Sequence, residues 1–269
     1  MLEGRKEMAL LRCEFFSDTL RLSTSMMVIL PEQTEGQIGM KNRQKDDAHP
    51  VLYLLHGFSD DETVWTRRTS IERYAADKGL AVIMPNADHS YYTDMRFGKR
   101  YWTFLTEELP QRAHDFFHLS DKREDTFVAG LSMGGYGAFK WALNYPGKFA
   151  AAASLSGVTD MAAHLKNART RETTSSAPLS LVFGQDEIKD TYEDLLWLLT
   201  YNEKNPGTKP VLYQACGTED FLFPQNQTFR EKCTQTSLSL TTDFGPGDHH
   251  WQYWDEQIKK VLEWLPIRK

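Results

Sequence analysis

The sequence predicts an α/β protein whose mainly parallel central sheet is covered by helices on both faces. Short, continuous apolar runs that end in Gly, Pro or Asn recur along the chain, as strands buried on both faces do. Segments with a helical pattern of apolar residues lie between these runs. Strands that alternate with helices form βαβ crossovers, which produce a parallel sheet.

The strands are predicted in two groups. Strand-like runs at Ala9–Phe16 and Ser25–Leu30 flank a polar turn, which indicates an opening hairpin or a pair of edge strands, and a polar loop follows over Pro31–Pro50. The apolar runs then predict buried strands at 51–57, 80–86, 126–132, 149–157, 209–217 and 237–245.

Helices are predicted at 71–78, 103–117, 135–144 and 252–264. The alternation lapses over 158–206, where a Thr/Ser-rich loop and a helix-like run favour an insertion that caps the C-terminal edge of the sheet. We expect residues 1–269 to form a single domain, since the length suits one well-buried core. Residues 1–8 are expected to be disordered or an addition to the native chain from cloning, with Met8 as an alternative start.

Composition excludes several function classes. The net charge of -6, with no stripe of Lys or Arg, predicts no nucleic-acid partner. The three cysteines lack metal-binding or disulfide spacing, so we expect reduced thiols in a cytoplasmic protein and no metal site. No apolar run has the length of a signal peptide or a membrane span, so no membrane association is expected. The sequence leaves open whether the protein forms a homo-oligomer.

The nucleophile is predicted from the stretch VAGLSMGGYGA. It contains Gly130-Leu131-Ser132-Met133-Gly134, a G-x-S-x-G pattern that follows an apolar strand and opens a helix. This context is the one the motif requires, because its Ser occupies a strained strand-to-helix turn that only small flanking residues permit. The alternative is a Gly-rich turn with an incidental Ser. A phosphate-binding loop would need Gly-Lys-Ser/Thr, which does not follow.

Two backbone amides are candidates for an oxyanion hole. The Met133 N–H lies at the start of the predicted helix, directly after Ser132. The second donor is predicted to be the Phe58 N–H, because Gly57 lets the chain turn close to the reacting centre at the end of a buried strand. His56, at the end of that strand, is expected to be a structural histidine bonded to loop backbone.

A serine nucleophile needs an imidazole base and a carboxylate that fixes the tautomer of the imidazole. In the chain order of the α/β-hydrolase fold, the acid and then the His follow the Ser. Asp186 and Glu187 lie in the irregular insertion, whereas Glu219 and Asp220 directly follow the apolar run VLYQACG. Asp220 is therefore the predicted acid, with Glu219 as the lesser alternative.

The candidate bases are the adjacent residues His249 and His250, the only histidines downstream of Asp220. Chain order selects this pair and does not decide between its members.

Four stretches resemble the tributyrin esterase group of bacterial carboxylesterases, which are relatives of esterase D, the S-formylglutathione hydrolases and the feruloyl and acetyl esterases. These stretches are VLYLLHGFSD, GLSMGGYGAFK, CGTEDFLF and GDHHWQYWDEQI. The resemblance covers about 9–266 and is loosest over 33–47 and 158–208. It implies the α/β-hydrolase fold, Ser132 and Asp220 as catalytic residues, and an oxyanion hole made by Phe58 and Met133.

The same resemblance separates the two histidines. The catalytic His of the group stands in a G-x-H-x-W setting, which Gly247-Asp248-His249-His250-Trp251 matches with His249 in the catalytic place. His250 is then a tolerated variant. One stretch departs from the pattern: S-formylglutathione hydrolases usually carry Leu-Thr-Cys after the His-Gly pair, whereas this chain has Phe58-Ser59-Asp60-Asp61. That difference argues against a glutathione thioester as substrate.

We therefore expect a serine carboxylesterase that acts on short acyl esters of small molecules without a metal or cofactor. The alternatives are an S-formylglutathione-type thioesterase, an acyltransferase and a non-catalytic member of the fold. Aromatic residues are expected to line the active-site rim and to stack on sugar or aryl leaving groups, with core packing as the alternative for each. The candidates are Trp65, Tyr91, Tyr92, Tyr101, Trp102 and Trp251.

Overall fold

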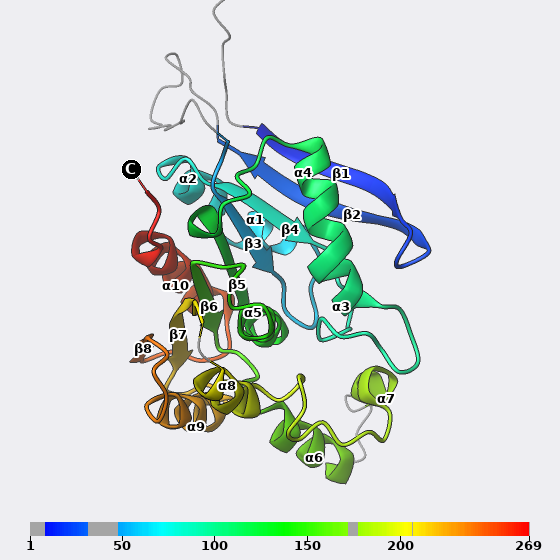
Figure 1. Ribbon diagram of the computed structural model, residues 1–269, viewed down its shortest axis with the longest axis vertical. Helices are drawn as coiled ribbons and strands as arrows, with labels where there is room; N and C mark the ends of the chain where they lie inside the picture. Colours follow the sequence, from blue (N-terminus) through cyan, green and yellow to red (C-terminus); the bar gives the residue numbers. More distant parts are fainter. Residues whose placement is uncertain (1–8, 32–47, 172–176, 206, 269) are drawn as a thin grey trace, which may run out of the picture.

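A central sheet of eight strands organises the protein in the computed structural model, which describes residues 9–31, 48–171, 177–205 and 207–268 (Figure 1). The strand order is β1-β2-β4-β3-β5-β6-β7-β8. Strands β3 to β8 are parallel, and β2 is antiparallel to both of its neighbours. The strands are β1 Ala9–Ser17, β2 Leu22–Leu30, β3 Val51–Leu55, β4 Ala81–Pro85, β5 Thr126–Leu131, β6 Ala151–Leu155, β7 Val211–Gly217 and β8 Leu240–Gly245.

Helices follow most of the strands, so the predicted fold class is confirmed. They are α1 Val64–Arg68, α2 Ile71–Ala76, α3 Tyr101–Thr103, the π-helix η1 Phe104–Glu108, α4 Leu109–Phe116, the 3-10 helix η2 Arg123–Asp125, α5 Met133–Asn144, α6 Met161–Arg171, α7 Ala177–Phe183, α8 Leu195–Lys204, α9 Phe223–Cys233 and α10 Trp251–Trp264. Most of the predicted loop over 31–50 and residues 1–8 lie outside the described residues.

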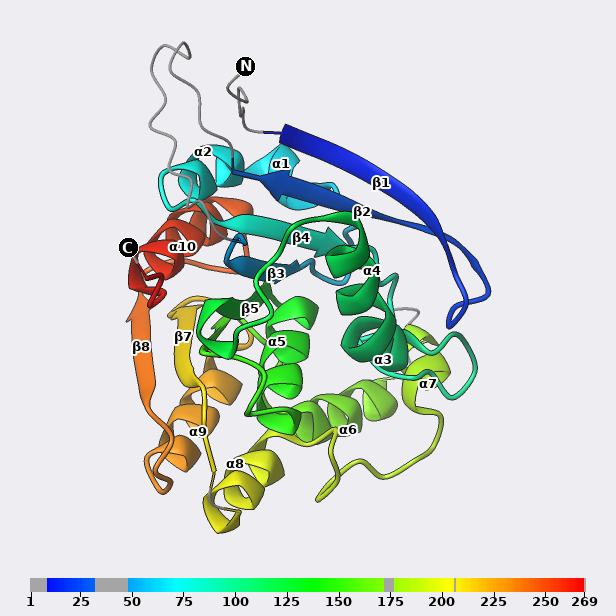
Figure 2. The same ribbon diagram turned by 45° about the horizontal axis from the view of Figure 1, so that its top comes forward.

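Side chains on the two faces of the sheet belong to two separate cores. Along β3, Tyr53 and Leu55 point into the core under α5, and Leu52 and Leu54 point into the core under α10, because successive residues of a strand face opposite ways. Figure 2 shows α1, α2 and α10 on one side of the strands and α4 and α5 on the other. Both faces of the central strands are therefore covered, which is why they read as continuous apolar runs.

The predicted helix over 103–117 is built from three pieces, α3, η1 and α4. The physical reason is Pro110, whose nitrogen carries no hydrogen and cannot donate to the carbonyl one turn back. That carbonyl, on Thr106, accepts a hydrogen bond from Lys148 Nζ at 3.2 Å instead. The π-helical turn absorbs the interruption.

Helices α6, α7 and α8 occupy the segment between β6 and β7 where the sequence alternation lapses. Helix α8 packs against α5, and its first turn is capped by the Asp194 carboxylate, which accepts from the N–H groups of Leu196 and Trp197. In the ranges that the structure describes, no helix is long and apolar enough to cross a membrane.

Candidate active site

Ser132 lies on the sharp turn between β5 and α5. Its backbone angles are φ 52° and ψ −115°, a strained region for a residue with a side chain, which costs about 1–3 kcal/mol. The turn closes only because its neighbours are glycines. A Cβ on Gly134 would lie 2.6 Å from the His56 carbonyl oxygen, and a Cβ on Gly130 would collide with the backbone of Gly134. This is the physical basis of the G-x-S-x-G pattern.

Asp220 and His249 come from the loops after β7 and β8, and the structure brings both to Ser132. His249 Nδ1 lies 2.8 Å from Asp220 Oδ2, and His249 Nε2 lies 3.0 Å from Ser132 Oγ. An ionised carboxylate only accepts hydrogen bonds, so Nδ1 carries the proton and Nε2 is left to accept from the Ser132 hydroxyl. The arrangement of acid, base and hydroxyl is the one that activates a serine.

The surroundings of Asp220 favour its charged form. Burial alone would raise the pKa of this carboxyl, but hydrogen bonds from His249, the Leu222 N–H and Ser156 hold it below its usual value. The Leu222 N–H donates to Asp220 Oδ1 at 2.8 Å, which leaves Oδ2 for the imidazole. Ser156 Oγ is itself held by Trp254 Nε1 at 3.2 Å.

Two aromatic rings fix the plane of the His249 imidazole. The Phe221 ring centroid lies 4.7 Å from it, and that of Trp254 lies 4.8 Å away at a right angle. Sequence reasoning missed both contacts. The sequence contained a signal for each contact. Phe221 directly follows the predicted acid Asp220, and Trp254 lies one helical turn after Trp251, on the same face of the predicted helix.

The other candidates for the acid do not reach His249. The Glu219 carboxylate points to the opposite side of the loop, where it accepts from the Gly247 N–H at 2.5 Å and from the Thr218 hydroxyl at 2.8 Å. It thereby holds the segment that carries His249. Asp186 and Glu187 are exposed in the segment between α7 and α8.

The remaining candidate histidines lie away from Ser132. The side chain of His250 is 70% exposed at the cavity rim, with Nδ1 3.7 Å from Asp248 Oδ1. His56 is buried, and burial lowers its pKa. Its Nδ1–H donates to the Gly57 carbonyl at 2.7 Å, and its Nε2 accepts from the Ala87 N–H at 3.0 Å. Both bonds go to backbone, as predicted for a structural histidine.

The two amides predicted for the oxyanion hole are free to bind a ligand. Met133 is the first residue of α5, so its N–H has no partner within the helix. Phe58 follows the end of β3 and lines the same cavity as Ser132. Neither N–H donates to a protein acceptor in the part of the chain that the structure describes.

Ser132 and His249 open into a cavity of about 1520 Å³. Its walls come from the loop after β3, from α6 and from the start of α10. Three carboxylates, Asp60, Asp248 and Glu256, line it, and no Lys or Arg does so among the described lining residues. The ionisable side chains that line the cavity are therefore acidic or histidine, although burial raises the pKa of Asp60.

The predicted aromatic contacts need correction. Trp251 lines the cavity, as does Tyr91. The prediction is wrong for Trp65, which is fully buried and donates from Nε1 to the Leu55 carbonyl at 3.1 Å. It is wrong for Tyr92 as well, whose ring is fully buried.

Tyr101 and Trp102 also lie outside the cavity. Tyr101 is 7% exposed and lines a separate, smaller hollow beside β2. Trp102 packs on Tyr145, and the ammonium of Lys140 lies 4.2 Å from its ring centroid. Both rings stand on α3, which packs against the core around α5, and neither residue lines the cavity that contains Ser132.

No group of three or more His, Cys, Asp or Glu side chains that could hold a metal ion exists among the described residues. The three cysteines are free thiols, and burial raises the pKa of each. Cys216, the one nearest Asp220 in the sequence, is fully buried in β7. An inert thiol is the expected result of such burial.

Comparison with known proteins gives the family. The family model described as "Putative esterase" matches residues 17–265. An acetyl esterase of Caldicellulosiruptor saccharolyticus is 28% identical over 262 residues, which cover 96% of this chain and 98% of that protein.

Two similar solved structures come from Staphylococcus aureus. One is FphF, a fluorophosphonate-binding serine hydrolase, with a TM-score of 0.85, and the other is an S-formylglutathione hydrolase, FrmB, with a TM-score of 0.83. Each is 36% identical to this chain, covering 97% of it and 99% of the other chain. Because the family model and both structures extend over nearly the whole chain, the protein belongs to this esterase family and is a serine carboxylic ester hydrolase with the α/β-hydrolase fold.

Proposed function

We propose that the protein hydrolyses short-chain acyl esters with uncharged leaving groups through a Ser132-His249-Asp220 triad. The observation that carries the proposal is the continuous line of hydrogen bonds from Asp220 Oδ2 through both nitrogens of His249 to Ser132 Oγ. Its geometry meets the requirement that nucleophile and base lie within about 2.6–3.2 Å of each other.

In the acylation step, Ser132 Oγ attacks the ester carbonyl while His249 Nε2 accepts the hydroxyl proton. Asp220 stabilises the imidazolium that results, and the N–H groups of Phe58 and Met133 donate to the oxyanion of the tetrahedral intermediate. The imidazolium then gives its proton to the leaving alcohol. The C–O bond breaks, and the acyl group stays on Ser132.

Deacylation repeats the same transfers with water. His249 Nε2 removes a proton from a water molecule, whose oxygen attacks the acyl carbonyl, and the proton returns to Ser132 Oγ as the acid leaves. The same five groups, three side chains and two backbone amides, serve both half-reactions. No step requires chemistry that the side chains and amides of the chain cannot supply.

Two observations support the proposed acyl group and leaving group. The acetyl esterase relative favours a short acyl chain, as do the motifs shared with the tributyrin esterase and esterase D group. The carboxylates of Asp60, Asp248 and Glu256 around the cavity disfavour an anionic leaving group, because like charges repel in a confined site. An uncharged alcohol, such as a sugar, aryl or glycerol hydroxyl, fits both.

A second candidate is a thioesterase for S-formylglutathione. The likeness to the Staphylococcus aureus S-formylglutathione hydrolase over nearly the full length favours it. The cavity argues against it, since glutathione carries two carboxylates and one ammonium and would bring net negative charge to a site lined by carboxylates.

The test compares kcat/KM for p-nitrophenyl acetate and for S-formylglutathione, in wild type and in Glu256→Gln. We expect wild type to prefer the neutral ester, and Glu256→Gln to raise kcat/KM for S-formylglutathione severalfold while that for the ester stays constant, since the variant removes one repelling charge. A wild-type preference for S-formylglutathione that Glu256→Gln leaves unchanged would favour the thioesterase.

Asp220→Asn is expected to lower kcat by about 10⁴-fold, because an amide facing Nδ1 can donate to it and stabilise the wrong tautomer of His249. Steady-state kinetics with p-nitrophenyl acetate measure the loss. Glu219→Gln is the matched control, since its side chain faces the other side of the loop and its amide oxygen can still accept from the Gly247 N–H. Equal losses in the two variants would contradict Asp220 as the acid.

The stability of the protein should depend on the charge of Asp220. Its pKa in the folded state lies below the usual 3.8, so the unfolded chain takes up the proton first as the pH falls. The stabilisation is therefore complete above pH 3.8 and is lost as the pH falls through the folded value. Urea unfolding at several pH values should show a steeper acid loss in wild type than in Asp220→Asn, and parallel curves would contradict this assignment.

A further inference from the structure

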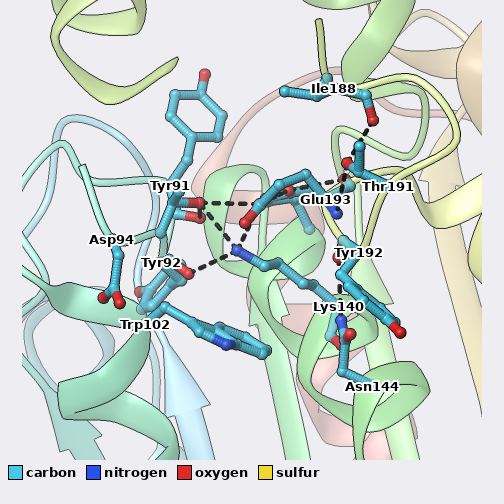
Figure 3. A network of polar contacts seen from close by, with 12 residues as sticks. Tyr91, Tyr92, Asp94, Trp102, Lys140, Asn144, Ile188, Thr191, Tyr192 and Glu193 are labelled. Atoms are coloured by element: carbon cyan, nitrogen blue, oxygen red, sulfur yellow. Dashed lines mark hydrogen bonds and ion pairs between the residues drawn. The ribbon is translucent and has the colours of Figure 1, made fainter. Parts of the chain in front are cut away.

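Lys140 places a charged ammonium in the interior of the protein. The residue stands on α5, the helix that begins after Ser132, and its side chain is fully buried. Nζ donates to the Tyr92 carbonyl at 3.1 Å and to Thr93 Oγ1 at 3.0 Å, and it pairs with Glu193 Oε2 at 2.5 Å (Figure 3). Its three hydrogens are thus matched by three oxygens, as a buried charge requires.

The backbone that Lys140 contacts is strained. Tyr91 and Tyr92 have φ values of 51° and 52°, and two successive non-glycine residues in the left-handed region are held there only by their surroundings. Lys140 supplies a direct bond to the Tyr92 carbonyl. Thr93 Oγ1, which accepts from Lys140, lies 3.1 Å from the Tyr91 carbonyl. The ammonium and the hydroxyl together engage both carbonyls of this turn.

The two tyrosines connect the turn to the loop that carries Phe58. The Tyr92 hydroxyl donates to the His56 carbonyl at 2.9 Å, two residues before the Phe58 amide. The Tyr91 ring lines the cavity, with its centroid 5.6 Å from that of the Phe58 ring. The turn therefore supports this loop twice, once through a hydrogen bond to its backbone and once through ring packing.

Glu193 extends the same cluster to the segment before α8. Besides Lys140, its carboxylate accepts from the Tyr136 hydroxyl at 2.8 Å, and it lies 3.2 Å from Thr93 Oγ1. The adjoining Tyr192 carbonyl accepts from Asn144 Nδ2 at 3.1 Å on α5 (Figure 3). One ion pair thus joins the nucleophile helix, the strained turn and the chain leading into α8.

We infer that Lys140 and Glu193 are positioning residues for the esterase reaction, which hold the Tyr91-Tyr92 turn and through it the Phe58 N–H of the oxyanion hole. The inference rests on the proposed roles of Ser132 and Phe58. Neither residue of the pair lines the cavity that contains Ser132. Their effect is on the placement of a donor that acts mainly in the transition state, where an error of about 1 Å can cost about 100-fold in rate.

The test replaces Lys140 with Met, which fills a similar volume without charge. With p-nitrophenyl acetate we expect kcat to fall about 10–100-fold while KM changes little, because the misplaced donor weakens transition-state binding more than ground-state binding. A trifluoromethyl ketone, which forms an oxyanion on the serine, should bind more weakly by a comparable factor. Assays are run where circular dichroism shows the variant to be folded.

Lys148→Met is the matched control. Lys148 is another lysine held by a carbonyl and an aromatic ring, with Nζ 3.2 Å from the Thr106 oxygen and 5.0 Å from the Trp141 ring centroid, and it makes no bond to the turn. We expect it to lower the melting temperature and to keep the wild-type kcat and ketone affinity. A purely structural role of Lys140 predicts that both variants lose stability and neither loses turnover per folded molecule.

Tyr92→Phe tests the same path without disturbing the buried charge, because it deletes only the hydroxyl that donates to His56. We expect it to lower kcat and ketone affinity together, and if Lys140→Met does not fold it still tests the link from the turn to the Phe58 loop on which the inference depends. Wild-type kcat and ketone affinity in the folded variants would overturn the inference while leaving the triad intact. Wild-type protein without ester turnover would instead contradict the proposed function, and this inference with it.

Discussion

Replacing Ser132 with Ala is expected to lower kcat by about 10⁵-fold on every ester that the wild-type enzyme hydrolyses, because Ser132 Oγ is the hydroxyl that lies against the base His249. The loss is large because the hydroxyl that the base activates is removed. His249 Nε2 lies 3.0 Å from Ser132 Oγ, on a turn whose strained backbone aims that oxygen into the cavity. The activity that remains would come from the oxyanion donors and from substrate binding.

The Ser132→Ala variant should keep its fold, since the methyl group occupies the position of the native Cβ. Its melting temperature and far-ultraviolet circular dichroism are therefore measured beside its kinetics. A well-folded variant with turnover near that of the wild type would contradict Ser132 as the nucleophile. Turnover lost together with the fold would point to damage at the turn, and Ser132→Cys then provides a second nucleophile at the same site.

Replacing His249 with Ala should be almost as damaging, with a fall in kcat of about 10⁵-fold, because Ser132 loses its base and Asp220 loses its partner. His250→Ala is the matched control one residue away. Its ring is 70% exposed and is directed toward Asp248, so kcat should stay within about twofold of wild type. Steady-state kinetics on both variants with the same ester measure the contrast.

The opposite pattern would overturn the assignment of the base. If His250→Ala abolished turnover and His249→Ala kept it, the loop after β8 would have to present the other imidazole during catalysis. Equal losses in both variants would indicate that the loop, and neither ring alone, is what the reaction requires.

The nucleophile turn was predictable because its signal is local. Gly130, Ser132 and Gly134 lie within five consecutive residues, and the steric demand that fixes them acts within the same turn and the neighbouring strand end. The strands were predictable for a similar reason, since both faces of β3 to β7 are buried and leave continuous apolar runs. Chain order then predicted Asp220 and the two adjacent histidines as site residues, but it did not decide between His249 and His250.

The aromatic contacts were not predictable because burial depends on where a helix docks. The sequence around Trp65 and Trp251 does not show which of the two is buried. In the structure their rings pack edge to face with centroids 5.2 Å apart, but Trp65 lies in the core and Trp251 lines the cavity. Lys140 gave a partial signal, because a lysine between Phe139 and Trp141 in an otherwise apolar helix must find partners. Its partner Glu193 lies 53 positions away, and no local pattern links the two residues.

The proposed mechanism requires that Ser132 carries the acyl group, which can be tested by identifying the residue that becomes acylated. Wild-type protein is mixed with excess p-nitrophenyl acetate, quenched in acid during the first turnovers, digested and analysed by mass spectrometry. In the wild type we predict an acetyl group on Ser132. In His249→Ala we expect acetylation of Ser132 only after long incubation, and in Ser132→Ala we expect none at this position. Rapid ester turnover with an acetyl group on another side chain, or with Ser132 unmodified throughout, would show that Ser132 is not the nucleophile.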